Sequence, residues 1–259
     1  MKVARYSYRG VASWGIVVDG QIHALEGELW GAMRPGERVC ALDDAKLLAP
    51  VGPHNKALGL GLTYKDMYRE YEFREGKGHR DGPATFMKPS NTLVGQMDPI
   101  VYHAVCKRLI YEAEVAIIIG KRASRLSLDD AQDVIAGYTC VNDVTATDFA
   151  LVERPIVSTR FKICDTFCPA GPVVETEMDP ADITVICRVN GREVQRSRTG
   201  RDMVWSFAEL LVWVTGFMTL EPGDMICTGA AGTGRIEVGD MVEVEIPGIG
   251  VLVNPVAAP

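Results

Sequence analysis

The sequence has no excess of basic residues and no hydrophobic run long enough to cross a bilayer. Its 259 residues carry a formal net charge of −7, which disfavours binding to nucleic acid or to an anionic membrane surface. The longest apolar runs, such as residues 115–119, have five residues, whereas a membrane span needs about 20 residues. The first ten residues lack the apolar core of a signal peptide. We therefore expect a cytoplasmic protein with no nucleic-acid or membrane partner.

The cysteines support neither a disulfide framework nor a zinc ribbon. There are seven of them, an odd number, and none forms a C-x-x-C pair. Hydrophobic residues make up 47% of the chain and charged residues 24%, which is the mixture of an ordinary globular protein. A chain of this length buries a sizeable core without covalent or metal staples.

Short apolar runs separated by turn residues dominate the chain and predict β-strands. Near the N-terminus, two such runs flank Asp19-Gly20, a typical hairpin signal. Residues 47–53 contain two prolines and a glycine and predict a boundary. We expect a small β-rich N-terminal domain over residues 1–52 and a larger domain over 53–259. The fold class is α+β, mostly β, closer to a rolled sheet or sandwich than to a parallel α/β fold.

Three segments predict helices. Residues 64–75 are the first, and residues 127–136 are the second because Ser127 is a good N-cap followed by acids. Residues 206–215 are the third, since apolar residues recur there at helical spacing. The charged, glycine-containing residues 75–83 form a loop, either a mobile lid or a plain solvated connection.

Acidic residues near one apolar run are the most informative feature. Glu112 and Glu114 are two positions apart, which places both carboxylates on one face of a strand. Asp143 follows another apolar segment, so three carboxylates converge if the two strands are neighbours. Such a group needs a cation, a shared proton or solvent, and oxygen ligands suit Mg²⁺ or Mn²⁺ better than Zn²⁺. From spacing alone, both glutamates on the solvent face of an edge strand remain an alternative.

Four motifs in a fixed order add a family resemblance. They are YEAEVAIIIGKRA at 111–123, AGYTCVNDV at 136–144, DTFCPAGP at 165–172 after Lys162, and TLEPGDMICTG at 219–229. Together they closely resemble the fumarylacetoacetate hydrolase family over residues 53–255. Residues 1–52 resemble the small N-terminal domain of bacterial members of the 2-hydroxyhepta-2,4-diene-1,7-dioate isomerase and 5-oxopent-3-ene-1,2,5-tricarboxylate decarboxylase type.

The resemblance implies a rolled β-sandwich catalytic domain that is usually dimeric. It implies that Glu112, Glu114 and Asp143 bind Mg²⁺ or Mn²⁺. It also implies that Lys162, which taken alone would be interpreted as a surface lysine, reaches the substrate. It further implies that the Thr228-Gly229 turn binds the carboxylate or enolate oxygens of the substrate. Tyr64 and Lys88 lie in other family-like segments, and we expect both to be substrate-binding residues, Lys88 by guiding an anionic substrate.

Two positions depart from the family pattern. Hydrolytic and decarboxylating relatives carry a histidine three residues before a glutamate, and this chain has Met67 and Glu70 there. Methionine cannot transfer a proton, which argues against water activation at this position. His79 is either a substitute base or a surface histidine. Relatives commonly carry an arginine where Thr147 stands, so one cationic contact is missing.

These residues predict a metal-dependent isomerase or decarboxylase acting through an enolate. The expected substrate is a small 2-oxo or 2-hydroxy-dienoic dicarboxylate from aromatic catabolism, with Lys162 steadying the enolate and Glu70 moving the proton. Two alternatives stay open. One is acylpyruvate hydrolysis with Glu70 or His79 activating water, and the other is a catalytically degenerate protein that keeps metal and fold and only binds a metabolite.

Overall fold

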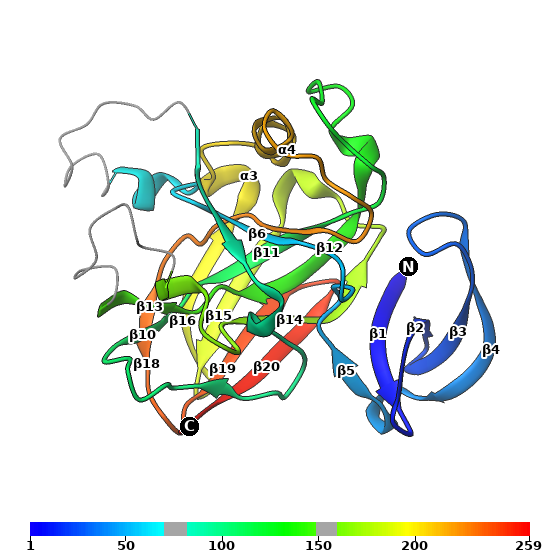
Figure 1. Ribbon diagram of the computed structural model, residues 1–259, viewed down its shortest axis with the longest axis horizontal. Coiled ribbons are helices and arrows are strands. Elements are labelled where there is room, and N and C mark those ends of the chain that lie inside the picture. The colour runs from blue at the N-terminus through cyan, green and yellow to red at the C-terminus, as the bar shows by residue number, and fades with distance from the viewer. Residues whose placement is uncertain (70–81, 149–159) are drawn as a thin grey trace.

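The computed structural model describes residues 1–69, 82–148 and 160–259, and strands dominate this part of the chain (Figure 1). The longest sheet has twelve strands, ten of them in the order β4 (Met33–Ala41), β3 (Gln21–Gly27), β2 (Val11–Val18), β1 (Lys2–Tyr8), β14 (Cys168–Glu175), β12 (Ile135–Asn142), β11 (Ala113–Ile119), β17 (Met225–Cys227), β6 (Ala57–Gly61) and β7 (Ala84–Lys88). The other two strands are β5 (Lys46–Leu48), which pairs with β1, and β8 (Leu93–Val94), which pairs with β14.

Two smaller sheets and a few helices complete the described part. The five-stranded sheet runs β16 (Arg192–Arg198), β15 (Thr184–Val189), β19 (Met241–Ile246), β20 (Gly250–Ala257) and β9 (Ile100–Val101). The three-stranded sheet runs β13 (Thr145–Ala146), β10 (Leu109–Tyr111) and β18 (Gly234–Ile236). The helices with both ends described are α3 (Thr199–Asp202), α4 (Phe207–Thr215) and the 3₁₀ turns η1 (Leu42–Asp44), η2 (Ser90–Thr92), η3 (Gln132–Val134), η4 (Arg160–Lys162) and η5 (Pro180–Asp182). Residues 65–69 and 147–148 are helical as well. The prediction of a mostly β, α+β fold is confirmed.

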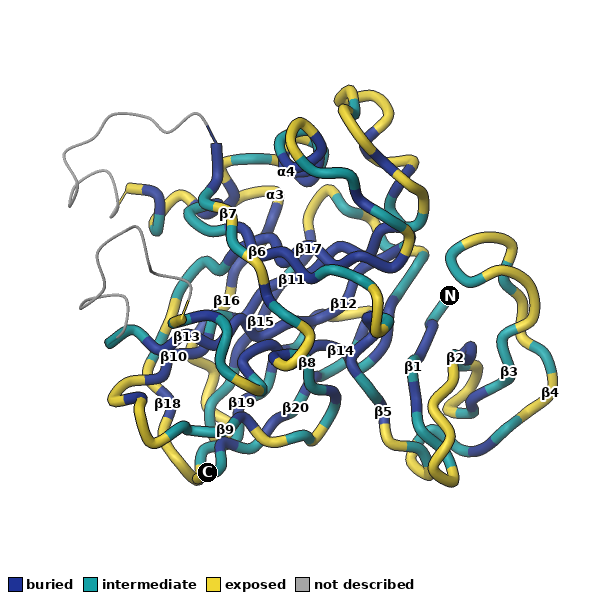
Figure 2. Tube along the Cα trace, in the orientation of Figure 1, coloured by how far each residue is buried: buried dark blue, intermediate teal, exposed yellow. Residues whose placement is uncertain are grey.

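Strand β11 lies at the centre of the core and is buried on both faces (Figure 2). Residues 115, 117 and 119 pack into one apolar cluster, which includes residues of β15 and β19 from the five-stranded sheet. Residues 116 and 118 pack into a second cluster on the opposite face. The continuous apolar run in the sequence is therefore the buried strand that it predicts.

The N-terminal strands continue the sheet of the larger part of the chain. Strands β2 and β3 form the predicted hairpin, with Asp19 and Gly20 both at positive φ in the turn. Strand β1 pairs antiparallel with β14 through Lys2 opposite Glu175 and Val3 opposite Val174. The domain boundary near residue 52 stays a prediction.

The predicted helices have different outcomes. Helix α4 forms with Ser206 and Glu209 in a capping box, which satisfies free N–H groups of its first turn. The predicted helix at 127–136 is wrong: η3 is a short 3₁₀ turn, and residues 135 and 136 belong to β12. Pairing of β12 with β11 extends to Ile135, so the last residues of the predicted helix are extended.

The remaining predictions of this kind fall mostly outside the described residues. Residues 65–69 are helical, whereas Tyr64, predicted as the first helical residue, forms an isolated β-bridge with Met203. Residues 70–75 of the predicted helix, together with His79 and residues 75–81 of the loop, lie outside the described residues. In the described part of the chain, no helix is long and apolar enough to cross a membrane.

Candidate metal centre

Strands β11 and β12 bring the three predicted carboxylates together. Their antiparallel register places Glu114 opposite Val141, so the residue before β11 and the residue after β12 meet, and the Asp143 amide donates to the Glu112 carbonyl at 2.9 Å. One carboxylate oxygen from each of Glu112, Glu114 and Asp143 lies within 4.8 Å of the others. Strand β11 lies between β12 and β17, and Glu114 is only 2% exposed. The alternative of glutamates on a solvent-facing edge strand is wrong.

Lys162 lies in η4 and points into this acidic group. Its ammonium donates to Glu112 Oε2 and, at 2.6 Å, to Asp143 Oδ2, and the residue is 5% exposed. Burial alone would lower the pKa of Lys162, but the Asp143 and Glu112 carboxylates raise it above its ordinary value. The surface-lysine interpretation is therefore wrong, and Lys162 is a buried, charged ammonium.

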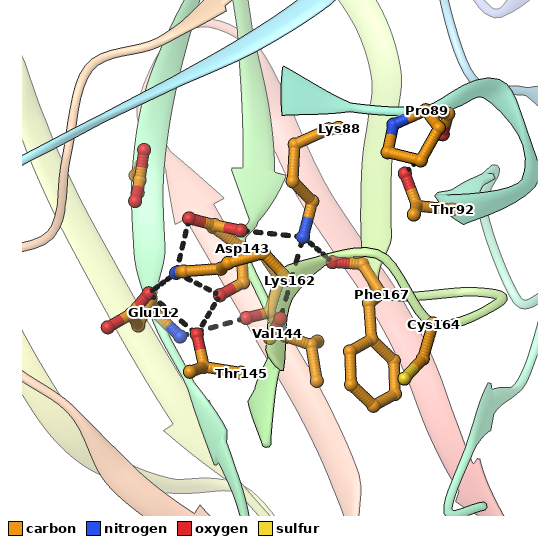
Figure 3. A network of polar contacts seen from close by, with 12 residues as sticks. Lys88, Pro89, Thr92, Glu112, Asp143, Val144, Thr145, Lys162, Cys164 and Phe167 are labelled. Atoms are coloured by element: carbon orange, nitrogen blue, oxygen red, sulfur yellow. Dashed lines mark hydrogen bonds and ion pairs between the residues drawn. The ribbon is translucent and has the colours of Figure 1, made fainter. Parts of the chain in front are cut away.

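Lys88 is a second buried ammonium, at the end of β7 (Figure 3). Its Nζ lies 2.7 Å from Asp143 Oδ1, and it donates to the carbonyls of Phe167 at 2.6 Å and Val144 at 3.5 Å. The two lysines thus contact different oxygens of the same carboxylate.

The electrostatics of the site are those of crowded carboxylates. Burial raises the pKa of Glu114 well above its ordinary value, and the charges of Asp143 and Glu112 raise it further. Burial also raises the pKa of Glu112, against the effect of Lys162. The pKa of Asp143 is lowered, because Lys162 and Lys88 outweigh its burial. The chosen carboxylate oxygens lie within 4.8 Å of one another, and two unit negative charges at that distance repel by about 3 kcal/mol at an effective dielectric constant of about 20.

A divalent cation fits these residues. Three ionised carboxylates and two ammoniums carry a net charge of −1. A divalent cation would neutralise this charge and offset the mutual repulsion of the carboxylates. Asp143 Oδ1 is buried and accepts no hydrogen bond, so it keeps a lone pair for a cation despite its ion pair with Lys88. The donors are all oxygens, which is the ligand set that Mg²⁺ and Mn²⁺ prefer.

The predicted substrate-binding residues near β11 contact the site or support it. Tyr64 is buried, and burial followed by the charge of Glu114 raises its pKa. The Thr228 hydroxyl donates to the Val115 carbonyl at 2.8 Å. The Gly229 amide donates to Glu114 Oε2 at 2.7 Å, with φ at +95°. Thr228 and Gly229 therefore hold β11 and its glutamate, and their contact with substrate stays a prediction.

Met67 and Thr147, the two departures from the family pattern, are both half-buried. Met67 lies in the helical residues 65–69. The Thr147 amide donates to the Arg108 carbonyl at 3.0 Å. Neither side chain carries a titratable group.

Sequence reasoning missed several residues that shape the site. Thr145 donates to Glu112 Oε2 at 3.0 Å, and Asn142 Oδ1 accepts from the Glu112 amide at 3.0 Å. Both belong to the segment that contains Asp143, so their closeness in sequence was an available signal. The centroid of the Phe86 ring lies 4.8 Å from Lys162 Nζ, as in a cation–π contact. No local sequence pattern predicts this contact.

Gly59 provides the space for Phe86. The two residues are cross-strand partners in β6 and β7, and a methyl group on Gly59 would overlap the Phe86 ring. We expect Gly59→Ala to destabilise the protein by about 1–3 kcal/mol and to shift Phe86 away from Lys162. Gly61→Ala on the same strand is the control, since its nearest atoms lie at 3.6 and 3.9 Å. Urea unfolding tests the pair, and equal stability of both variants would contradict the prediction.

Comparison with known proteins gives the family. A family model described as "Fumarylacetoacetate (FAA) hydrolase C-terminal" matches residues 56–257, and one described as "Rv2993c-like, N-terminal" matches residues 1–50. The chain is 36% identical over 222 residues to the mitochondrial oxaloacetate tautomerase Fahd2a of Rattus norvegicus, covering 81% of this chain and 68% of the relative.

Solved structures agree over the whole chain. The 2-hydroxyhepta-2,4-diene-1,7-dioate isomerase from Mycobacterium marinum has a TM-score of 0.88 at 33% identity, covering 100% of this chain and 98% of that chain. The maleylpyruvate hydrolase from Sphingobium sp. SYK-6, in complex with manganese(II) and pyruvate, has a TM-score of 0.79 at 27% identity, covering 100% and 99%. The chain belongs to the fumarylacetoacetate hydrolase family.

Proposed function

We propose that this protein is a divalent-metal-dependent isomerase that interconverts the keto and enol forms of a small 2-oxo dicarboxylate such as oxaloacetate. Glu112, Glu114 and Asp143 would hold the Mg²⁺ or Mn²⁺ ion. The observation that carries the proposal is the convergence of these three carboxylates, two of them buried, with the ammonium of Lys162. The names of the tautomerase and isomerase relatives support the choice of reaction.

The proposed reaction moves one proton and changes no other atom. The carbon next to the 2-oxo group loses a proton, and the carbonyl oxygen gains one as it becomes the enol hydroxyl. When bound, the cation supplies Lewis-acid stabilisation of the negative charge that develops on that oxygen. Lys162 supplies a fixed ammonium beside the same position, worth most where water is excluded. We assign the removal of the carbon-bound proton to Glu70, which lies outside the described residues.

Isomerisation is favoured over hydrolysis by the residue at position 67. Hydrolysis requires an activated water, and Met67 cannot accept its proton. Decarboxylation forms its own enolate by losing carbon dioxide instead of a proton and needs no activated water, so it stays within the proposal.

Acylpyruvate hydrolysis is the second candidate, because the similar maleylpyruvate hydrolase performs chemistry of that class by its name. In that case Glu70 or His79 would activate water. A degenerate metabolite-binding protein would bind the cation and the ligand and release no product.

The test is an assay of metal-stripped protein with oxaloacetate and a panel of 2-oxo and dienoic dicarboxylates, with and without Mg²⁺. Ultraviolet absorbance follows the enol and mass spectrometry follows the product. A cation-dependent change of absorbance at constant mass supports isomerisation. Loss of carbon dioxide indicates decarboxylation, and fragmentation with added water indicates hydrolysis. No change with any compound, despite bound Mg²⁺, would favour the degenerate binder.

Cation affinity is expected to fall as the pH falls. The raised pKa of Glu114 means that its proton is held at a higher pH than in an ordinary glutamate, and a cation must displace that proton. Affinity therefore weakens as the pH drops through this raised pKa, and binding releases protons there. Calorimetry with Mn²⁺ in buffers of different ionisation enthalpy measures both effects. Constant affinity down to about pH 4.3, the ordinary glutamate pKa, would contradict the prediction.

The homodimer and the cytoplasmic location follow from the resemblance and from the composition, and both stay predictions. Light scattering after size-exclusion chromatography tests the first directly.

A further inference from the structure

The surroundings of Lys88 are those of a buried structural ion pair and not of a residue that binds substrate. Its side chain is fully buried, with 0% exposure. An ammonium has three N–H groups, and the Lys88 Nζ contacts three oxygens, namely Asp143 Oδ1 and the carbonyl oxygens of Phe167 and Val144. Two of the N–H groups donate to the carbonyls, and the ammonium faces Asp143 Oδ1 as an ion pair. Fully buried among these oxygens, Lys88 presents no surface to a substrate.

The contacts of Lys88 converge on one carboxylate and on the backbone beside it. Figure 3 shows the two lysines approaching Asp143 from different directions, Lys162 at Oδ2 and Lys88 at Oδ1. A carboxylate held at both oxygens cannot rotate freely about its side-chain bond. Lys88 also joins the backbone at residue 144, which follows Asp143, to the carbonyl of Phe167, immediately before β14.

We infer that Lys88 is a positioning residue that fixes the Asp143 carboxylate for the cation and does not touch the substrate. This inference rests on the proposed function, because it requires a cation at the three carboxylates. It replaces the substrate-binding role expected for Lys88 from the sequence. Partners that orient a metal ligand in this way typically change metal affinity by about 10–100-fold when they are removed.

The two roles predict different measurements on Lys88→Met. A positioning role predicts that the Kd for Mn²⁺ rises about 10–100-fold and that the electron paramagnetic resonance spectrum of bound Mn²⁺ changes. At saturating Mn²⁺, the Kd for oxalate, a non-reacting analogue of a 2-oxo acid, should stay within about twofold of wild type. A substrate-binding role predicts the reverse, with unchanged Mn²⁺ affinity and weaker oxalate binding.

A matched ion pair elsewhere in the chain provides the control. Lys56 Nζ lies 2.5 Å from Asp224 Oδ2, and Asp224 is 1% exposed. Lys56→Met removes a lysine from a buried aspartate outside the acidic group, so it should lower stability and leave the Mn²⁺ Kd unchanged. A general structural disturbance would move both variants alike, whereas positioning of Asp143 moves only the Lys88 variant.

Circular dichroism and thermal unfolding establish that each variant is folded, and Lys88→Gln replaces Lys88→Met if the latter is not. An Mn²⁺ Kd that is unchanged in the folded Lys88 variant overturns the inference. Wild-type protein that binds Mn²⁺ without turning over any substrate overturns the proposed reaction and leaves this test intact, because both readouts are binding constants. Wild-type protein that binds no Mn²⁺ overturns both proposals.

Discussion

Replacing Asp143 with asparagine is expected to remove tight binding of the divalent cation and to lower turnover by about 10³-fold. The substitution keeps the size of the side chain and removes its charge. Asp143 is the carboxylate whose pKa is lowered by two buried ammoniums, so it is the ligand most firmly held as an anion. A loss of 10³-fold corresponds to about 4 kcal/mol of transition-state stabilisation. Titration with Mn²⁺ and steady-state kinetics measure the two effects.

The control for this substitution is Asp224→Asn. Asp224 is equally buried, is ion-paired with Lys56, and accepts hydrogen bonds from two backbone amides. Its replacement should lower the free energy of unfolding without changing Mn²⁺ affinity. Folded Asp143→Asn protein with wild-type Mn²⁺ affinity would show that the three carboxylates are not the metal site.

Replacing Lys162 with methionine is expected to lower kcat by about 10²–10⁴-fold while Mn²⁺ binding is kept or strengthened. The ammonium lies between two of the three carboxylates, Glu112 and Asp143, whereas Lys88 contacts Asp143 alone and is anchored to two backbone carbonyls. Removing Lys162 therefore deletes the positive charge that competes with the cation for two of its ligands. The same change removes the fixed ammonium that stabilises the developing enolate oxygen. Parallel measurement of kcat and of the Mn²⁺ Kd separates the two consequences.

Lys107→Met provides the comparison for Lys162, since Lys107 is an exposed lysine and its replacement should change neither quantity. A Lys162 variant with wild-type kcat would remove this residue from the mechanism. A variant that loses Mn²⁺ instead would make Lys162 a structural support of the carboxylates.

The sequence was sufficient for the parts of the site that one strand pair holds. Glu112 and Glu114 share a strand face by their spacing, and the buried run beside them predicts a central strand. Antiparallel pairing of β11 with β12 then brings in Asp143. The spacing of the glutamates and the apolar run are local patterns. They predict the structure correctly because both faces of β11 are buried.

Other parts depend on contacts between distant segments. Phe86 reaches Lys162 only because Gly59 stands opposite it on the next strand, and no period in the sequence records that pairing. Lys88 carries the charge expected of a substrate ligand, yet the fold buries it against Asp143. The segment after Ser127 has the signals of a helix, but its last residues, 135 and 136, belong to β12, which pairs with β11. Tertiary pairing overrides local propensity in that case.

The central claim is that cation-loaded protein forms an enolate next to a 2-oxo group, and deuterium wash-in tests it most directly. The protein is incubated in D₂O with a 2-oxo dicarboxylate, and deuterium at the carbon beside the carbonyl is followed by mass spectrometry above the protein-free rate. We predict incorporation that requires Mg²⁺ or Mn²⁺, stops with a chelator, and falls to background in Asp143→Asn. Incorporation that persists at the same rate in the chelator, or none at all from protein with bound Mn²⁺, would contradict the claim.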